Sequence, residues 1–246
     1  MEREKLINQR LEAYIDYESW NLPVSLKKIY NEAVQDEVPV IRKPVQTFLK
    51  TLLKIHKPKN ILEIGAAVGF SALLMSEYTD EDTRIITIEK VPARIKKAKE
   101  NISKYDKYGK IKLIEGDALQ IKEELDKLRQ AEKEEEVEKS DALDNFDDTL
   151  ESEISEEFDF IFMDAAKGQY PAMLPILLSV LKPGGILITD NILHDGDIIE
   201  SRYSVNRRDR TIHSRMREYV TMLTHNEGLS TSILPIGDGI SLSVKL

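Results

Sequence analysis

Apolar residues recur at the three- and four-residue spacing of an amphipathic helix through the first part of the chain. This pattern predicts helices over Met1–Glu18, Leu22–Gln35 and Val45–Ile55, with Pro39 and Pro44 marking the approach to the third helix. The helices occupy residues 1–57, before the first strand signal. We therefore expect them to pack on a face or an edge of the sheet that follows, or on a second subunit.

From residue 61 the pattern changes to short apolar runs that alternate with helical segments. Strands are predicted at residues 61–64, 84–89, 111–115, 158–164, 185–190, 229–235 and 239–245, and helices at 70–78, 92–104, 119–129, 170–181 and 211–226. This alternation predicts one α/β domain over residues 1–246, a Rossmann-like fold with a seven-stranded, mostly parallel sheet. The last two strands are joined only by residues 236–238, which predicts a hairpin and an antiparallel strand at the C-terminus.

Charge is distributed unevenly along the chain. The formal net charge is −9, but residues 123–157 hold 16 acidic and 4 basic residues, and the rest of the chain holds 28 acidic and 31 basic residues. Within this segment, residues 131–157 have the composition of an acidic, mobile insertion. A specific acidic binding motif is the alternative. Because the body is mildly basic, the overall charge does not exclude a nucleic-acid partner.

Two further features of the composition narrow the class of protein. The chain has no cysteine, so a disulfide framework and a thiolate metal site are excluded. No apolar run is long enough to cross a membrane. We expect a cytoplasmic protein with no membrane partner, in which any metal ion is held by oxygen or imidazole ligands.

The segment Asn60–Ser71, NILEIGAAVGFS, joins a strand to a helix through a glycine-containing turn. Glu63 leads into the turn, Gly65 can adopt a positive φ, and Gly69 permits close approach to the backbone. The first turn of the helix leaves N–H groups free for an anionic ligand. The spacing is not that of the dinucleotide fingerprint, which weakens a pyrophosphate fit. A turn that only joins strand to helix is the alternative interpretation.

Polar residues end four of the predicted strands, at the edge where open α/β sheets bind ligands. Glu89 is placed to accept hydrogen bonds from a ribose diol, and Asp117 to meet the edge of an adenine. Asp164 and the pair Asp190–Asn191 end strands that neighbour each other in this fold, so their oxygen atoms can converge on Mg²⁺, Mn²⁺ or Ca²⁺. In each case, a helix cap or turn is the alternative.

Lys167 follows Asp164 by three residues. A lysine beside a divalent cation and partly removed from water has its neutral form favoured, so Lys167 is a candidate general base. An ordinary surface lysine is the alternative.

The segments ILEIGAAVGFSAL, ITIEKVP, EGDAL, IFMDAAKGQY, LITDNIL and IPIGDGISLS resemble the class I S-adenosylmethionine-dependent, divalent-metal O-methyltransferases of the catechol and caffeoyl-CoA type. Within that group, DAAKGQY, TDNIL and PIGDG are most similar to the bacterial tRNA 5-hydroxyuridine methyltransferases. The chain departs from the group at Ala67, which replaces a common glycine, and in the acidic insertion.

This resemblance implies a role for individual residues. Asp164, Asp190 and Asn191 would bind Mg²⁺, and Lys167 and Asp164 would be catalytic. The residues that would bind S-adenosylmethionine are Val38, Glu63, Gly65, Gly69, Ser71, Glu89, Asp117, Ala118 and Asp164. The resemblance also implies a homodimer.

The prediction extends to the identity of the substrate. The resemblance implies methylation of 5-hydroxyuridine in a tRNA anticodon, and a basic series that follows the Asp190–Asn191 strand is a candidate for binding the tRNA phosphates. The series consists of Arg202, Arg207, Arg208, Arg210, Arg215 and Arg217. A solvated helix face is the alternative for these arginines, and a small catechol-like hydroxyl is the alternative substrate. Alternatives from other classes are an NAD-dependent oxidoreductase and a non-catalytic Rossmann binding module.

Overall fold

The computed structural model describes residues 9–127, 130, 158–201 and 203–246. The start of the first predicted helix, the insertion 131–157 and Arg202 lie outside the described residues. Three N-terminal helices come first, at Gln9–Ser19 (α1), Val24–Gln35 (α2) and Lys43–His56 (α3). Helix α3 begins two residues before its predicted start, because Pro44 lies within its first turn, where a missing N–H costs no hydrogen bond.

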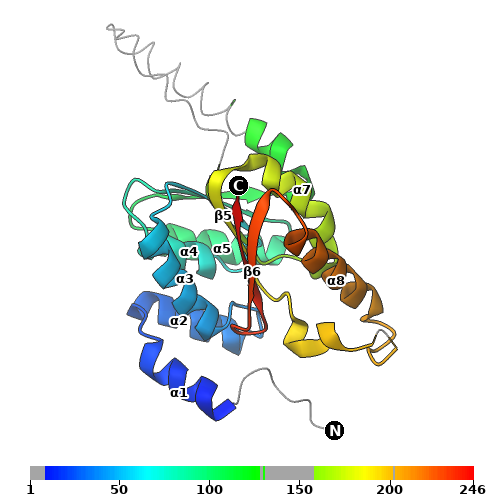
Figure 1. Cartoon of the computed structure of the whole chain (residues 1–246). Helices are drawn as coiled ribbons and strands as arrows, with labels where there is room; N and C mark the ends of the chain where they lie inside the picture. The colour runs from blue at the N-terminus through cyan, green and yellow to red at the C-terminus, as the bar shows by residue number, and fades with distance from the viewer. Residues whose placement is uncertain (1–8, 128–129, 131–157, 202) are drawn as a thin grey trace, which may run out of the picture.

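A seven-stranded sheet with the order β3-β2-β1-β4-β5-β7-β6 forms the centre of the molecule (Figure 1). Its strands are Asn60–Ile64 (β1), Arg84–Glu89 (β2), Ile111–Glu115 (β3), Phe158–Met163 (β4), Leu181–Thr189 (β5), Leu229–Leu234 (β6) and Ile240–Lys245 (β7). Strands β1 to β5 are parallel, and β7 is antiparallel to both β5 and β6. The predicted fold, with its C-terminal antiparallel strand, is confirmed.

Helices cover both faces of the sheet. One face packs against α2, α3 and Phe70–Glu77 (α4), and the other against residues 121–125, Tyr170–Val180 (α7) and Arg210–Thr224 (α8). Helix Pro92–Tyr105 (α5) follows β2, and short 3₁₀ turns lie at Ala118–Gln120 (η1), Lys167–Gln169 (η2) and His194–Ile199 (η3). Strand β4 is buried along its whole length, as its continuous apolar run predicts.

The fifth strand starts earlier than the predicted range 185–190. Strand β5 already begins at Leu181, which pairs with Phe158, and the next pair joins Ile186 to Phe160. The register therefore shifts across the extra residues on β5, and Gly184 among them has φ 77°. The run KPGG lies within the strand.

Helix α1 carries exposed aromatic side chains. Tyr14 and Tyr17 are 63% and 86% exposed, so they do not belong to the core of this chain. They are compatible with the predicted homodimer, which stays a prediction. None of the described helices combines the length and the apolar character that crossing a membrane requires.

Candidate active site

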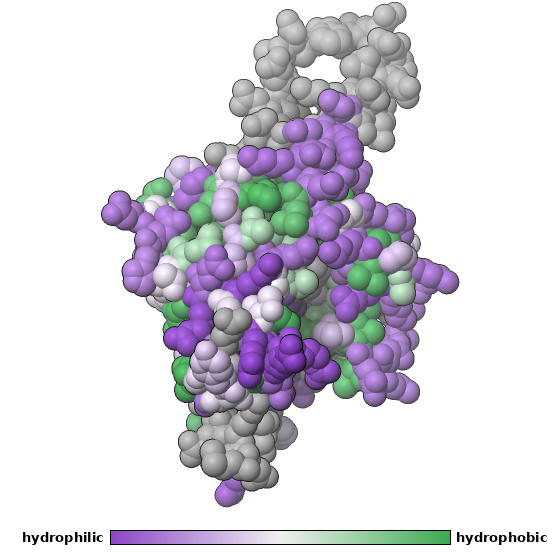
Figure 2. All heavy atoms as spheres, turned by 90° about the vertical axis from the view of Figure 1, so that its right-hand side faces the viewer, coloured by the Kyte–Doolittle hydropathy of each residue, from purple (hydrophilic) through white to green (hydrophobic). Residues whose placement is uncertain are grey.

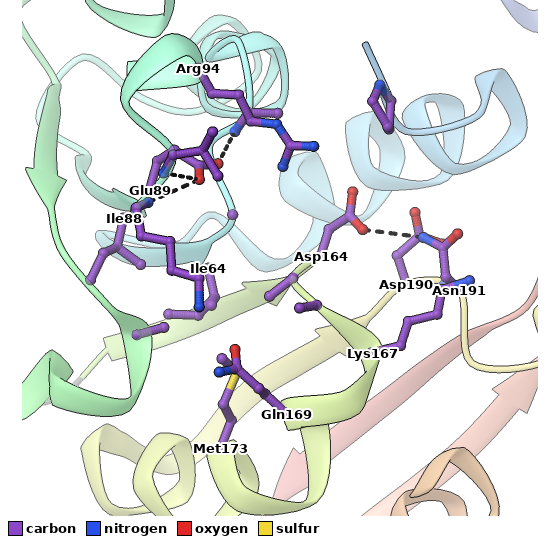
Figure 3. A pocket seen from close by; sticks show the side chains of 18 of the residues that line it. Ile64, Ile88, Glu89, Arg94, Asp164, Lys167, Gln169, Met173, Asp190 and Asn191 are labelled. Atoms are coloured by element: carbon purple, nitrogen blue, oxygen red, sulfur yellow. Dashed lines mark hydrogen bonds between the residues drawn. The ribbon is translucent and has the colours of Figure 1, made fainter. Parts of the chain in front are cut away.

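A cavity of about 780 Å³ lies at the carboxyl ends of β1, β2, β4 and β5. Its wall includes the glycine turn, the ends of four strands, η2 and residues 39–42, which connect α2 to α3. Figure 3 shows its side chains arranged around one central space. This is the edge at which the sequence predicts a ligand.

The glycine turn forms one wall of the cavity. Gly65 has φ 101°, and a Cβ at this position would lie 2.2 Å from the backbone oxygen of Asp164. Glycine is therefore needed both for the backbone conformation and for the close approach of β1 to the segment after β4. Gly69 is the N-cap residue of α4, with φ 79°. Ala67 also has a positive φ, of 46°, which is uncommon for a residue other than glycine.

Glu89 and Asp117 reach the cavity from the ends of β2 and β3. The Glu89 carboxylate accepts the backbone N–H groups of Ala67, Lys90 and Val91 at 2.9, 2.9 and 3.0 Å, and it retains acceptor capacity toward the cavity. The Leu119 N–H donates a hydrogen bond to the Asp117 carboxylate, which makes Asp117 the N-cap of η1. This hydrogen bond lowers the pKa of the Asp117 carboxyl. Gly65, Glu89, Asp117, Ala118 and Asp164 are thus brought together.

Four other predicted cofactor residues do not line this cavity: Val38, Glu63, Gly69 and Ser71. Glu63 is fully buried beneath the turn, where it accepts a hydrogen bond from the Thr87 hydroxyl and faces Ser71. Burial raises its pKa to about 7. Val38 lines a second cavity of about 230 Å³, whose wall also includes Arg94. Because Glu63 is fully buried beneath the turn, it supports the turn from below and lies outside the lining of the cavity.

Asp164, Asp190 and Asn191 converge as predicted. Asn191 Nδ2 lies 3.2 Å from Asp164 Oδ1, and Asp190 Oδ1 accepts the N–H of Asn191 at 2.7 Å (Figure 3). Burial, with the neighbouring Asp238 carboxylate, raises the pKa of Asp164 to about 6. Burial and the Asp164 carboxylate raise the pKa of Asp190 well above its ordinary value. Two carboxylates that are costly to ionise together form a place where a cation would be stabilised.

The donor set fits a hard divalent cation. Among the described residues, no three His, Cys, Asp or Glu side chains meet closely enough to hold a metal ion. A site here would therefore use two carboxylates and the amide oxygen of Asn191, with the amide turned from the orientation in which its Nδ2 faces Asp164, and water or substrate would complete the coordination. Asn191 has φ 62°, a conformation uncommon for a residue other than glycine, and it fixes the amide beside Asp164.

Lys167 lies on the same side of the cavity as Asp190 and Asn191 (Figure 3). Its Nζ is 3.9 Å from Oδ2 of Asp238, which belongs to the turn between β6 and β7. Arg42 Nη2 lies 3.7 Å from the same oxygen atom. Sequence reasoning identified Lys167 but missed Asp238 and Arg42, although the PIGDG motif contains Asp238.

Arg94 was also missed. It lies in the first turn of α5, and its guanidinium points into the space between Glu89 and Asp164 (Figure 3). Gln169 and Met173 reach the cavity from the η2 and α7 side. Nothing in the spacing of charged residues along α5 distinguishes Arg94 from its exposed basic neighbours.

The predicted arginines take different positions. Arg215 donates to the Gly168 carbonyl beside the cavity, and Arg210 donates to the Val205 carbonyl and lies over the Tyr203 ring. Arg207 and Arg208 are exposed. Figure 2 shows the side of the molecule where α8 lies, and hydrophilic residues cover much of it. Among the described arginines of this series, Arg215 is the one with a hydrogen bond to η2 in the cavity wall, and Arg217 is exposed.

The chain is similar to known methyltransferases in sequence and in fold. A family model described as O-methyltransferase matches residues 17–135 and 122–246. Tapetum-specific methyltransferase 1 of Arabidopsis thaliana is 30% identical over 199 residues, which are 81% of this chain and 75% of that protein. Catechol O-methyltransferase of Niastella koreensis is 26% identical over 202 residues, 80% of this chain and 78% of that protein. The SAH-bound methyltransferase PaMTH1 of Podospora anserina shares the fold, with a TM-score of 0.75, 24% identity and coverage of 100% of both chains.

Proposed function

The chain belongs to the O-methyltransferase family, and from this premise we propose that it transfers a methyl group from S-adenosylmethionine to a hydroxyl oxygen of tRNA 5-hydroxyuridine with the help of a divalent cation. One observation carries the proposal. A single cavity is lined by the Glu89 and Asp117 carboxylates at one end and by the Asp164, Asp190 and Asn191 cluster at the other, with Lys167 beside that cluster.

The cavity suits S-adenosylmethionine in size and in charge. Glu89 would accept the ribose hydroxyls, and Asp117 with the backbone at Ala118 would meet the adenine. The Arg94 guanidinium faces the space between Glu89 and Asp164, where it would bind the carboxylate of the methionine part. PaMTH1, which has the same fold, is described as SAH-bound.

Asp164, Asp190 and Asn191 would hold the cation. When bound, Mg²⁺ would lower the pKa of a hydroxyl beside it and stabilise the oxyanion that forms. The two carboxylates are desolvated by the protein itself, so a cation would relieve their mutual repulsion. This relief supports the metal part of the proposal.

The remaining chemistry is done by residues of the chain. Lys167, in its neutral form, would accept the hydroxyl proton. The substrate oxygen then bonds to the methyl carbon, while the electron pair of the carbon–sulfur bond stays on sulfur and S-adenosylhomocysteine is released. The walls of the cavity hold the oxygen, carbon and sulfur atoms in line, and this positioning supplies much of the rate.

Positive charge on α8 and just before it supports an RNA substrate, because α8 also contributes Ile212 to the cavity wall. Arg215 lies against η2, and Arg207 and Arg208 are exposed just before α8. Phosphate groups on either side of a target nucleotide would meet such charges. A small catechol is the second candidate, favoured by the Niastella koreensis relative.

A methylation assay with labelled S-adenosylmethionine tests the proposal. Purified protein would be given tRNA containing 5-hydroxyuridine, the same tRNA without that nucleoside, and catechol. Nucleoside mass spectrometry should find 5-methoxyuridine only in the first reaction. Turnover of catechol with no reaction on tRNA would refute the RNA substrate and keep the O-methyltransferase. Failure of calorimetry to detect S-adenosylhomocysteine binding would refute the cofactor.

A further inference from the structure

Asp238 is a buried carboxylate that joins three segments of the active site. Its side chain is 6% exposed, and one of its oxygen atoms faces both Lys167 Nζ, at 3.9 Å, and Arg42 Nη2, at 3.7 Å. Lys167 belongs to η2 and Arg42 is the N-cap residue of α3. The segment 39–42 and η2 are both parts of the cavity wall, and they meet through this carboxylate.

The backbone around Asp238 is held tightly in place. The Leu193 N–H donates to the Asp238 carbonyl at 3.1 Å, and the Ile192 N–H donates to the Gly239 carbonyl at 2.9 Å. A Cβ at Gly239 would lie 2.2 Å from Leu193 Cγ, so the turn packs closely against the residues that follow Asn191. Asp238 is therefore fixed relative to the predicted metal ligands, whereas Lys167 has a long side chain with four rotatable bonds.

From this geometry we propose that Asp238 is a positioning residue that orients the Lys167 amine toward the reacting hydroxyl and stabilises the ammonium ion formed when Lys167 takes up the proton. The inference rests on the proposed function of Lys167. The arrangement parallels enzymes in which a third group orients the base. Without Asp238, Lys167 would lose its anchor, and the distance between base and hydroxyl would vary.

A double-mutant cycle in urea unfolding tests the pair without any substrate. Asp238→Asn and Lys167→Met should each shift the urea midpoint, and the double variant should show less than the sum of the two shifts. Lys167→Arg, which keeps N–H donors opposite Asp238, should stay close to the parent. If Lys167→Met, Lys167→Arg and the parent have equal urea midpoints, the interaction between Lys167 and Asp238 is refuted, even if Asp238→Asn fails to fold.

A second cycle measures kcat for methyl transfer. Asp238→Asn should lower kcat roughly 10- to 100-fold. Its affinity for S-adenosylhomocysteine should change less than about twofold, and in the Lys167→Met background it should have no further effect. Equal losses of kcat in both backgrounds would overturn the positioning role.

Asp159→Asn is the matched control for this cycle. Asp159 is a buried carboxylate 3.3 Å from Lys182 Nζ, at the start of β4 and away from the cavity. The control should lower stability and leave kcat within about twofold. If the parent methylates no hydroxyl, the proposed function fails, and the unfolding cycle still decides whether Asp238 and Lys167 interact.

Discussion

The burial of Glu63 predicts how the unfolding free energy of the protein changes with pH. Its carboxyl lies fully buried beneath the glycine turn, with the Thr87 and Ser71 hydroxyls beside it, and its pKa rises from 4.5 to about 7 because burial disfavours the charged form. The Glu63→Gln variant imitates the protonated carboxyl and does not titrate. Both neighbouring hydroxyls can donate or accept hydrogen bonds, so the amide can be accommodated.

The sign and the size of the effect on unfolding free energy follow from the difference in the Glu63 pKa between the folded and unfolded states. Because the folded state holds the proton more tightly, its contribution to stability is fully present below pH 4.5 and is lost as the pH rises through about 7. At 1.36 kcal/mol per pKa unit, the parent should lose about 2.5 kcal/mol of unfolding free energy from this group between pH 5 and pH 8. Glu63→Gln should lack this loss.

Urea unfolding of both proteins at several values between pH 5 and pH 8 measures the effect. The free energy of the variant relative to the parent should rise by about 2.5 kcal/mol across this range. Glu227→Gln, which removes an exposed carboxyl, controls for the change in net charge. Parallel pH profiles for parent and Glu63→Gln would show that Glu63 keeps an ordinary pKa, and the argument from burial would be refuted.

Three further predictions concern the metal ligands, the exposed arginines before α8 and the glycine turn. Asp190→Ala should abolish methyl transfer while affinity for S-adenosylhomocysteine, measured by calorimetry, changes little; full activity of the parent in EDTA would contradict the metal site. Arg207→Ala with Arg208→Ala should weaken tRNA binding, and each lost phosphate contact should reduce the slope of log K against log salt by about 0.7 to 0.9; an unchanged slope would remove these arginines from the interface. Gly65→Ala should lower stability by about 1 to 3 kcal/mol or more and prevent cofactor binding, because its Cβ would meet the Asp164 carbonyl; Gly109→Ala, with φ 64° and no atom within 4 Å, should show the backbone strain alone.

The parallel part of the fold and its carboxyl edge could be predicted because they depend on local pattern. Each strand is a short apolar run, and the residue that ends the run lies at one edge of a parallel sheet. Asp164 and Asp190 illustrate this. Met163 pairs with Thr189, so the next residue on each strand lies beside the other. The sequence supplied both strand ends, and their adjacency followed from the fold.

Residues placed by packing were harder to predict. Glu63 stands in an apolar strand directly before the glycine turn, and its place in the sequence is typical of a ligand contact. Alternation along β1 decides the matter, because the side chain of Ile64 lies on the cavity wall and that of Glu63 does not. Arg94 presents the opposite case. It belongs to a helix rich in exposed lysines, and only the tertiary structure directs its guanidinium into the cavity.

Asp238 depends on a choice of strand pairing that the sequence leaves open. The short join between β6 and β7 predicts a hairpin but does not say which of its strands pairs with β5. In the structure β7 takes that position, and Ser241 pairs with Thr189. This register brings the start of β7 beside the end of β5, so the turn packs on the segment after Asn191. If β6 paired with β5 instead, β7 would begin one strand spacing, about 4.8 Å, farther away. A carboxylate at that distance could not anchor Lys167, so the strand order β5-β7-β6 is itself a requirement of the proposed positioning role.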